Sequence, residues 1–344
     1  MSKATLSFLL ALPLLAFGLV AGWIWWVEDH PETERELRLM AQEQLAEWFP
    51  EGMSLPPELI GFHPPSAAHE AESPEIILVH GLDEPGGIWD DLAVDLAAAG
   101  WTAWEFRYPN DQAIDHSADL LAEYWDQLDS ERVFLIGHSM GGLVIRDFVS
   151  RWRHPVGDAA AVAGPEVAGV ILIATPSQGS EWARLRAWLE LREWARDIPE
   201  GRFSLFASLR DGTGAAKIDL RPDSGFLSDL NARPWPQQIP RKIIGGRLAE
   251  PTSDMLDGLQ VLTREVGTDT LQTMIEQWWR DTGEGIGDGA VAVDSLVIDG
   301  APEPLILAAS HRGLLVRMPW SDEDPPAIAP VIAVLEAWRD DQRQ

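Results

Sequence analysis

The residues from Arg132 to Val149, RVFLIGHSMGGLVIRDFV, constrain the fold more than any other stretch of the chain. Val133 to Ile136 predict a buried strand, and the residues from Gly142 predict an amphipathic helix, so a sharp turn joins the two. Ser139 lies at the tip of this turn. A Cβ at position 137 or 141 would collide with the adjacent strand or helix, which explains the glycines there. The pattern therefore predicts a nucleophilic serine held clear of a sheet, with the first amides of the helix directed at a reacting centre.

Other apolar runs alternate with helical patterns along the chain. Strands are predicted over residues 75–81, 101–108, 167–174, 241–246 and 305–309, helices over 112–128 and 325–338, and a short strand or extended loop over 290–298. Strands of this apolar character that alternate with helices predict an α/β fold with a mainly parallel sheet covered on both faces. Ligands bind at the carboxyl ends of such strands, where Leu82, Ser139 and Thr175 fall.

A serine hydroxyl needs a neighbouring base, and the base needs an acceptor that fixes its tautomer. In this topology the histidine follows the serine in the chain. Only His154 and His311 lie beyond Ser139, and His154 falls at the remote end of the serine's own helix. We therefore predict that His311, which follows a predicted strand, is the base.

Asp288 is the predicted acceptor for the histidine. Glycines on both sides of it let the loop turn and leave the carboxylate directed inward. Asp254 and Asp257, closer to the strand at 241–246, are alternatives on spacing. An ordinary turn or a cation site is the alternative interpretation of the segment around Asp288.

Gly81 ends the strand that we expect beside the serine strand, and it permits a tight bend. The amides of Leu82 and Met140 are then predicted to converge on one oxygen as it becomes negative. We interpret His80 and His138 as buried scaffold residues outside the triad.

Acidic residues outnumber basic ones by 55 to 26, which gives a formal net charge of -29. This surface repels a phosphate backbone, so nucleic acid is excluded as a partner, and anionic lipid surfaces are disfavoured.

The chain has no cysteine, which excludes disulfides, thiolate catalysis and Cys-ligated metals. No cofactor is predicted, and metal catalysis is not expected because the sequence has no paired-histidine helix motif. A structural calcium ion bound by carboxylates is left open.

Thr5 to Val27 is a run of 23 residues without a charge, long enough to cross a bilayer. Trp23, Trp25 and Trp26 lie at its far end, where interfacial aromatic residues are found. The run exceeds the apolar part of a usual signal peptide and no clear A-x-A site follows it, so we predict an uncleaved membrane anchor within residues 1–29. Secretion after signal cleavage is the alternative. Lys3 and the amino terminus precede the run and acidic residues follow it, so by the positive-inside bias we expect the remainder of the chain to lie outside the cytoplasm.

Residues 30–74 are predicted as a stem that links the anchor to a catalytic domain of residues 75–344, with the boundary near Ser73. The first part of this stem is expected to form an amphipathic helix over residues 31–49, and the remainder a proline-rich connector. The apolar residues of this helix that we expect to be buried by packing are Leu37, Met40, Leu45, Trp48 and Phe49.

Residues 177–240 interrupt the alternation of strands and helices. Aromatic and leucine residues from 182 to 194 recur at helical spacing. We interpret this insertion as a lid over an apolar cleft, and an ordinary surface helix is the alternative.

Six ordered motifs resemble those of a known family. They are VHGL (79–82), GHSMGG (137–142), ATPSQGS (174–180), DLRPDSGFLSDLN (219–231), GDGAV (287–291) and SHRGLL (310–315). Over about residues 75–344 the chain is similar to α/β-hydrolases of the bacterial triacylglycerol lipase and esterase type. The loop DEPGG (83–87) and the strong acidity depart from the family pattern.

The resemblance implies a catalytic triad of Ser139, Asp288 and His311, with oxyanion amides from Leu82 and Met140. It implies hydrolysis of small-molecule or lipid carboxylic esters through an acyl-enzyme. Thioester or amide hydrolysis, acyl transfer to an alcohol, and a non-catalytic lipid-binding role are the alternatives that the sequence leaves open.

Overall fold

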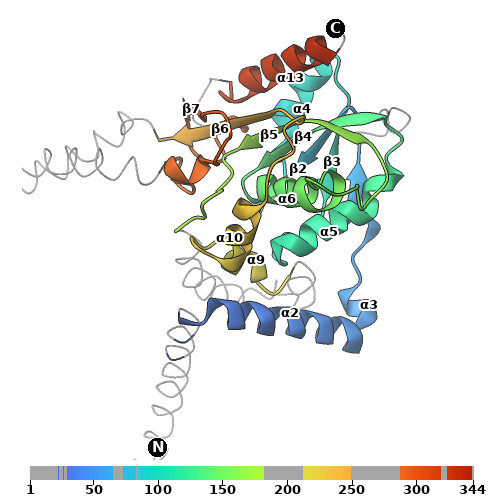
Figure 1. The fold of residues 1–344 in the computed structure, drawn as a ribbon, viewed down its shortest axis with the longest axis vertical. Helices are drawn as coiled ribbons and strands as arrows, with labels where there is room; N and C mark the ends of the chain where they lie inside the picture. The colour runs from blue at the N-terminus through green and yellow to red at the C-terminus, as the bar shows by residue number, and fades with distance from the viewer. Residues whose placement is uncertain are drawn as a thin grey trace, which may run out of the picture.

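A sheet of seven strands lies at the centre of the protein, in the order β1-β3-β2-β4-β5-β6-β7 (Figure 1). The structure is a computed structural model that describes residues 22, 26, 29–64, 73–82, 84, 86–181, 212–248, 287–318 and 324–342. The strands are β1 (Gly61–His63), β2 (Ile76–Val79), β3 (Ala103–Arg107), β4 (Arg132–His138), β5 (Glu166–Ile173), β6 (Arg241–Arg247) and β7 (Leu305–Ala308). β1 is antiparallel to β3, and the other neighbouring pairs are parallel. The predicted mainly parallel sheet is confirmed.

Helices cover both faces of this sheet. In the described part of the chain they are α2 (Pro31–Trp48), α3 (Pro50–Met53), α4 (Asp90–Ala98), α5 (Ile114–Tyr124), α6 (Met140–Phe148), α9 (Ala215–Asp219), α10 (Gly225–Ala232) and α13 (Ile328–Gln342). Shorter helical turns are η1 (Pro57–Leu59), η3 (Trp125–Gln127), η4 (Val149–Arg153) and η5 (Asp294–Leu296). Figure 1 shows α4 and α13 on one face of the sheet, and α5 and α6 on the other.

Alternate residues of β2 show why its sequence is apolar throughout. Ile77 and Val79 belong to the core cluster that contains α5 and α6, whereas Ile76 and Leu78 belong to the cluster that contains α4 and α13. Successive side chains of a strand point to opposite faces, and both faces of this strand are covered by helices. The strand is therefore buried on both sides, as its sequence predicted.

Two segments differ from the expected elements. Residues 290–298 contain the helical turn η5 rather than a strand. Residues 61–63, expected within the connector, form β1, in which Phe62 pairs with Phe106 of β3. The sheet therefore extends beyond the predicted boundary near Ser73.

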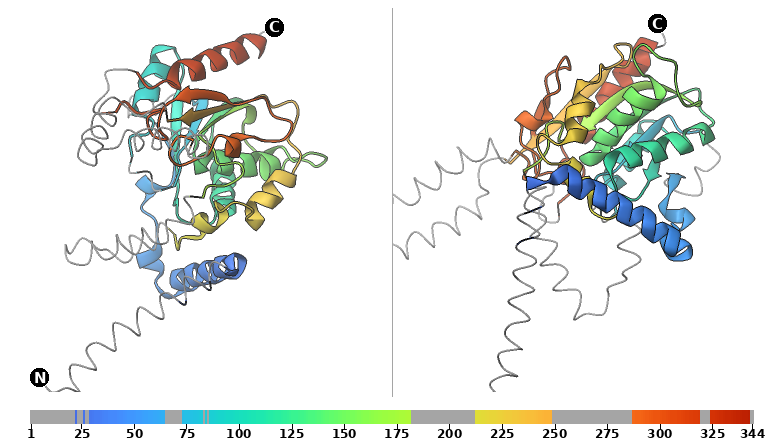
Figure 2. Two further views of the ribbon diagram at one scale, coloured as in Figure 1. Left: turned by 90° about the vertical axis from the view of Figure 1, so that its left-hand side faces the viewer. Right: turned by 60° about the horizontal axis from the view of Figure 1, so that its bottom comes forward.

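The helix predicted over residues 31–49 is present as α2, but its orientation is the reverse of the one expected. Leu37, Met40, Trp48 and Phe49 are 43%, 63%, 65% and 46% exposed, while Glu34 is 2% exposed. The prediction that these four apolar side chains are packed is wrong. The side of α2 that contacts the domain carries Arg35 and Glu34, which form ion pairs with Asp219 and Arg221. Both views in Figure 2 place α2 on the outside of the domain.

Several predicted features lie outside the described residues. They are nearly all of the uncharged run from Thr5 to Val27, the helix over residues 182–194, and the alternative acids Asp254 and Asp257. Within the part that the structure describes, no helix is both long and apolar enough to cross a bilayer. The anchor and the lid therefore stay predictions.

Candidate active site

Ser139 connects the end of β4 to the start of α6 in a backbone conformation that side chains rarely adopt. Its φ is 54° and its ψ is -128°, a strain that costs about 1–3 kcal/mol. The Ser139 amide donates a hydrogen bond to the Ile173 carbonyl at 2.8 Å, and the Ser139 carbonyl accepts one from the Gly142 amide at 3.1 Å. These contacts on β5 and α6 hold the turn. The predicted sharp turn between strand and helix is confirmed.

The glycines on either side of Ser139 are required by close backbone contacts. A Cβ built on Gly141 would lie 2.1 Å from the Val79 carbonyl oxygen, and one on Gly137 would lie 2.6 Å from the Gly142 Cα. No side chain fits at such distances, because both obstacles are backbone atoms. The expected collisions with the neighbouring strand and helix are therefore present.

Asp288 and His311 are brought together as predicted. His311 Nδ1 lies 2.8 Å from Asp288 Oδ2, and the amide of His311 donates to the Asp288 carbonyl at 2.9 Å. Asp288 is only 2% exposed, and its Oδ1 accepts the amides of Ala290 and Val291 at 2.9 and 2.8 Å. A carboxylate fixed in this way accepts a hydrogen bond from Nδ1–H, which leaves Nε2 of the imidazole as a base.

The loop that carries His311 lies beside the serine turn. The rings of His138 and His311 have centroids 4.7 Å apart, and His138 Nε2 lies 3.2 Å from the His311 carbonyl oxygen. Because His138 directly precedes Ser139, these contacts bring the loop next to the turn. The hydrogen bond between Ser139 Oγ and His311 Nε2 stays a prediction.

The backbone at Gly81 also lies against the serine. A Cβ built on Gly81 would be 2.7 Å from the Ser139 Cβ and 3.3 Å from its Oγ. Leu82 follows directly, and Met140 is the first residue of α6. Leu82 and Met140, the predicted oxyanion donors, therefore directly follow Gly81 and Ser139, which lie against each other. The convergence of the two amides on one oxygen stays a prediction.

His80 and His138 are buried scaffold residues, as expected. The His80 ring stacks on Tyr108 with centroids 4.5 Å apart, and the Tyr108 hydroxyl donates to the His80 carbonyl at 2.6 Å. Burial, reinforced by the nearby His311, holds the pKa of His138 well below its ordinary value. A neutral His138 donates from Nε2 to the His311 carbonyl without adding a second positive charge.

Arg312 is a site residue that the sequence interpretation did not single out, although it lies within the motif SHRGLL. Its guanidinium bonds to Glu84 and donates to the Gly86 carbonyl at 2.9 Å. These contacts tie the segment that follows Leu82 to the loop that carries His311. The sequence offered no signal for the pairing because the partners are 228 residues apart.

A cavity of about 570 Å³ lies at the other end of the sheet. Its lining includes Arg153, His154, Glu166 and Trp235, from the first residue of β5 and from segments that precede β5 and β6. The amino ends of these strands are opposite the edge that carries Ser139, so this cavity is separate from the candidate site. Among the described residues, no group of three or more His, Asp or Glu side chains could hold a metal ion.

Comparison with known proteins gave one family model and a set of solved structures. The model, described as the alpha/beta hydrolase family, matches residues 76–287, which is more than half of the chain. The metagenomic carboxyl esterase MGS0156 is 15% identical, with a TM-score of 0.51, over 79% of this chain and 77% of that one. At this identity the likeness concerns the fold alone.

Two bacterial lipase structures were also found. The mature form of the lipase BlEst2 from Bacillus licheniformis is 18% identical over 80% of this chain and 96% of that one, with a TM-score of 0.47. The Staphylococcus hyicus lipase is 13% identical over 79% and 98%, with a TM-score of 0.49.

Proposed function

Because this chain belongs to the alpha/beta hydrolase family, we propose that it is a serine hydrolase that cleaves carboxylic esters through an acyl-enzyme. The pairing of Asp288 with His311, beside the strained turn that carries Ser139, is the observation that carries the proposal. A backbone strain at a serine between a strand and a helix is expected where the hydroxyl must stand clear of the sheet.

In the proposed reaction Ser139 Oγ attacks the ester carbonyl while His311 Nε2 takes the hydroxyl proton. The imidazolium then gives this proton to the departing alcohol, and Asp288 holds the ring and stabilises its positive charge. The amides of Leu82 and Met140 donate to the oxyanion. Water, activated by the same imidazole, attacks the acyl-enzyme and releases the acid.

Replacement of the nucleophile tests this proposal. Ser139→Ala should abolish hydrolysis of a short p-nitrophenyl ester and labelling by a fluorophosphonate. In the unaltered protein, mass spectrometry should find the phosphonyl group on the peptide that contains Ser139. Ser130→Ala is the matched control, because Ser130 precedes the opposite end of β4 and donates to the Pro74 carbonyl. Undiminished turnover in Ser139→Ala would rule the proposal out.

We also infer that residues 1–29 anchor the protein in a membrane, with the hydrolase domain outside the cytoplasm. The uncharged run from Thr5 to Val27 supports the anchor, and the positive charges of Lys3 and the amino terminus before the run, with acidic residues after it, support the orientation. Protease that reaches the outer side of the intact cytoplasmic membrane should cleave the domain and leave a cytoplasmic protein intact, and a domain that stays uncleaved would contradict the orientation. Amino-terminal sequencing of the mature protein distinguishes an anchor from a cleaved signal.

A further inference from the structure

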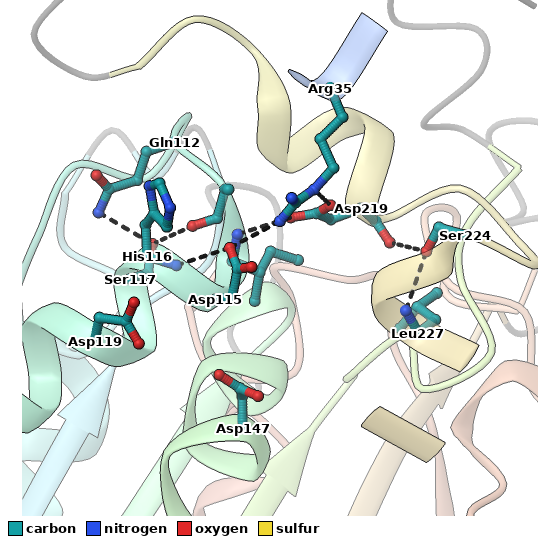
Figure 3. A network of polar contacts seen from close by, with 12 residues as sticks. Arg35, Gln112, Asp115, His116, Ser117, Asp119, Asp147, Asp219, Ser224 and Leu227 are labelled. Carbon is teal, nitrogen blue, oxygen red and sulfur yellow. Dashed lines mark hydrogen bonds and ion pairs between the residues drawn. The ribbon is translucent and has the colours of Figure 1, made fainter. Parts of the chain in front are cut away.

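The inner face of α2 is held against the hydrolase domain by charged groups. Arg35 Nε donates to Asp219 Oδ1 at 2.6 Å, and Arg35 Nη2 donates to Asp115 Oδ1 at 2.8 Å (Figure 3). Asp219 is 1% exposed and also accepts the Ile114 amide at 2.8 Å. One guanidinium thus joins α2 to both α9 and α5.

Further contacts fix the rotation of α2 about its own axis. Glu34 binds Arg38 one turn later at 2.7 Å and Arg221 of the domain at 3.5 Å. Glu32 accepts the amide of Gly225 at 3.0 Å, and the Thr213 hydroxyl donates to the Arg38 carbonyl at 2.9 Å. Because these polar groups point into the domain, the apolar stripe of the helix points outward.

The outward stripe is a concentration of exposed apolar surface. Leu37, Met40 and Trp48 lie within about 80° of one another on a helix of 3.6 residues per turn. Eight large apolar side chains are exposed in the described part of the chain, and five of them fall between residues 37 and 59: Leu37, Met40, Trp48, Phe49 and Leu59. Single exposed apolar residues are ordinary, but large apolar residues that share one side of a helix, as Leu37, Met40 and Trp48 do, indicate an interaction surface.

The position of α2 in the chain indicates what covers the stripe. The uncharged run ends at Val27 and α2 begins at Pro31, so the two are separated by at most about 14 Å of extended chain. His30 also bonds to the Trp26 carbonyl at 2.9 Å and stacks on the Trp26 ring. If the run crosses a bilayer, α2 therefore begins at the membrane surface.

The charges beside the stripe indicate the kind of lipid. Glu36, Glu43 and Glu47 are exposed and lie along one side of it on the helix. Helices that bind anionic membranes carry Lys and Arg at such positions. Carboxylates there are repelled by anionic headgroups, so a zwitterionic surface is the better match.

We propose that the exposed stripe of α2 (Leu37, Met40 and Trp48) lies in the headgroup region of a bilayer rich in zwitterionic lipid. The ion pairs of Arg35 and Glu34 on the inner face then fix the orientation of the hydrolase domain relative to that surface. The proposal rests on the inferred anchor and is independent of the catalytic assignment.

Single-cysteine labelling tests the proposal without ambiguity, because the chain has no cysteine of its own. Met40→Cys and Trp48→Cys, with Val94→Cys on α4 as the control, are made in the full chain. The replaced side chains are 63%, 65% and 68% exposed, so the three sites are matched. Each is spin-labelled and incorporated into phosphatidylcholine vesicles, and collisions with oxygen and with a water-soluble nickel complex are measured.

We expect the labels at positions 40 and 48 to collide more with oxygen and less with nickel than the label at 94. In vesicles rich in phosphatidylglycerol this difference should shrink at low salt and return at high salt. Nickel access at 40 and 48 equal to that at 94, in protein that floats with the vesicles, overturns the proposal and leaves the anchor standing. Shielding from both reagents with spin–spin broadening would indicate a second copy and overturn it as well. If the protein does not float with the vesicles, both the inferred anchor and the proposal are overturned. Ser139-dependent turnover of an ester tests the proposed function separately.

Discussion

Asp288 and Asp219 are both almost fully buried aspartates, and each binds a side chain that can carry a positive charge. Asp288 binds the His311 ring and two backbone amides. Asp219 binds the Arg35 guanidinium and the Ile114 amide. The partners differ in one chemical respect: an imidazole exchanges its proton near neutral pH, whereas a guanidinium does not.

This difference separates a pair suited to chemistry from a pair suited to docking. A histidine held by a carboxylate can act as a base and then as an acid. An arginine held by a carboxylate stays charged and gives a fixed fork of hydrogen bonds between two elements. We therefore expect changes at Asp288 to affect turnover, and changes at Arg35 or Asp219 to affect stability.

The largest expected effect comes from Asp288→Asn. The amide oxygen of asparagine can still accept the Ala290 and Val291 amides, but its NH₂ group would face His311 Nδ1 and favour the wrong tautomer. We expect kcat for a short ester to fall by about 10⁴-fold, with the urea midpoint of unfolding nearly unchanged. An Asp288→Asn variant that unfolds at a clearly lower urea concentration, or that keeps its activity, would contradict this distinction between Asp288 and Asp219.

Arg35→Met should have the opposite profile. Loss of the cation leaves the Asp219 carboxylate buried without its partner, which costs about 3 kcal/mol of unfolding free energy at pH 7. Turnover should stay within about twofold of the unaltered protein. Urea unfolding and ester kinetics on the same preparation measure both quantities, and a large fall in kcat at full stability would mean that α2 contributes to the reaction.

The titration of Asp219 sharpens the comparison. Burial raises its pKa from 3.8 to about 6, against the opposing effect of Arg35. Because the folded protein holds this proton more tightly than the unfolded chain, the contribution of Asp219 to stability falls as pH rises from about 4 to about 6 and is constant above. The stability of the unaltered protein minus that of Asp219→Asn should therefore decline by about 2–3 kcal/mol over this range. A difference that is flat, or that rises with pH, contradicts the assignment.

Arg312→Met tests an arginine pair that lies near the candidate site. Its bonds to Glu84 and Gly86 hold the segment after Leu82, whose amide is a proposed oxyanion donor. The pair is partly exposed, so we expect a loss of about 1 kcal/mol in transition-state stabilisation, or about fivefold in kcat/KM. An effect as large as that of Asp288→Asn would place Arg312 in the chemistry itself.

The sheet and the strained turn could be predicted because their signals are local. Apolar runs identify β2, β4 and β5, and glycines at fixed spacing identify the turn at Ser139. His311 followed by elimination along the chain. Asp288 followed from its flanking glycines, which have φ values of 57° and 99° in the structure. Each inference used residues close in sequence or an order imposed by topology.

The docking of α2 could not be predicted by the same means. Arg35 and Asp219 are 184 residues apart, and a charged residue on a helix is most simply interpreted as exposed to water. The apolar stripe was therefore assigned to the interior. β1 escaped prediction for a related reason, because a strand of three residues has no periodicity and exists only through its pairing with β3.

The most direct test of the central claim is a crystal structure of the protein after reaction with a fluorophosphonate. We predict phosphorus bonded to Ser139 Oγ, its oxygen within about 3 Å of the Leu82 and Met140 amides, and His311 Nε2 within hydrogen-bond reach of Oγ. Phosphorus on a different residue, or an imidazole at position 311 directed away from Ser139, would contradict the account.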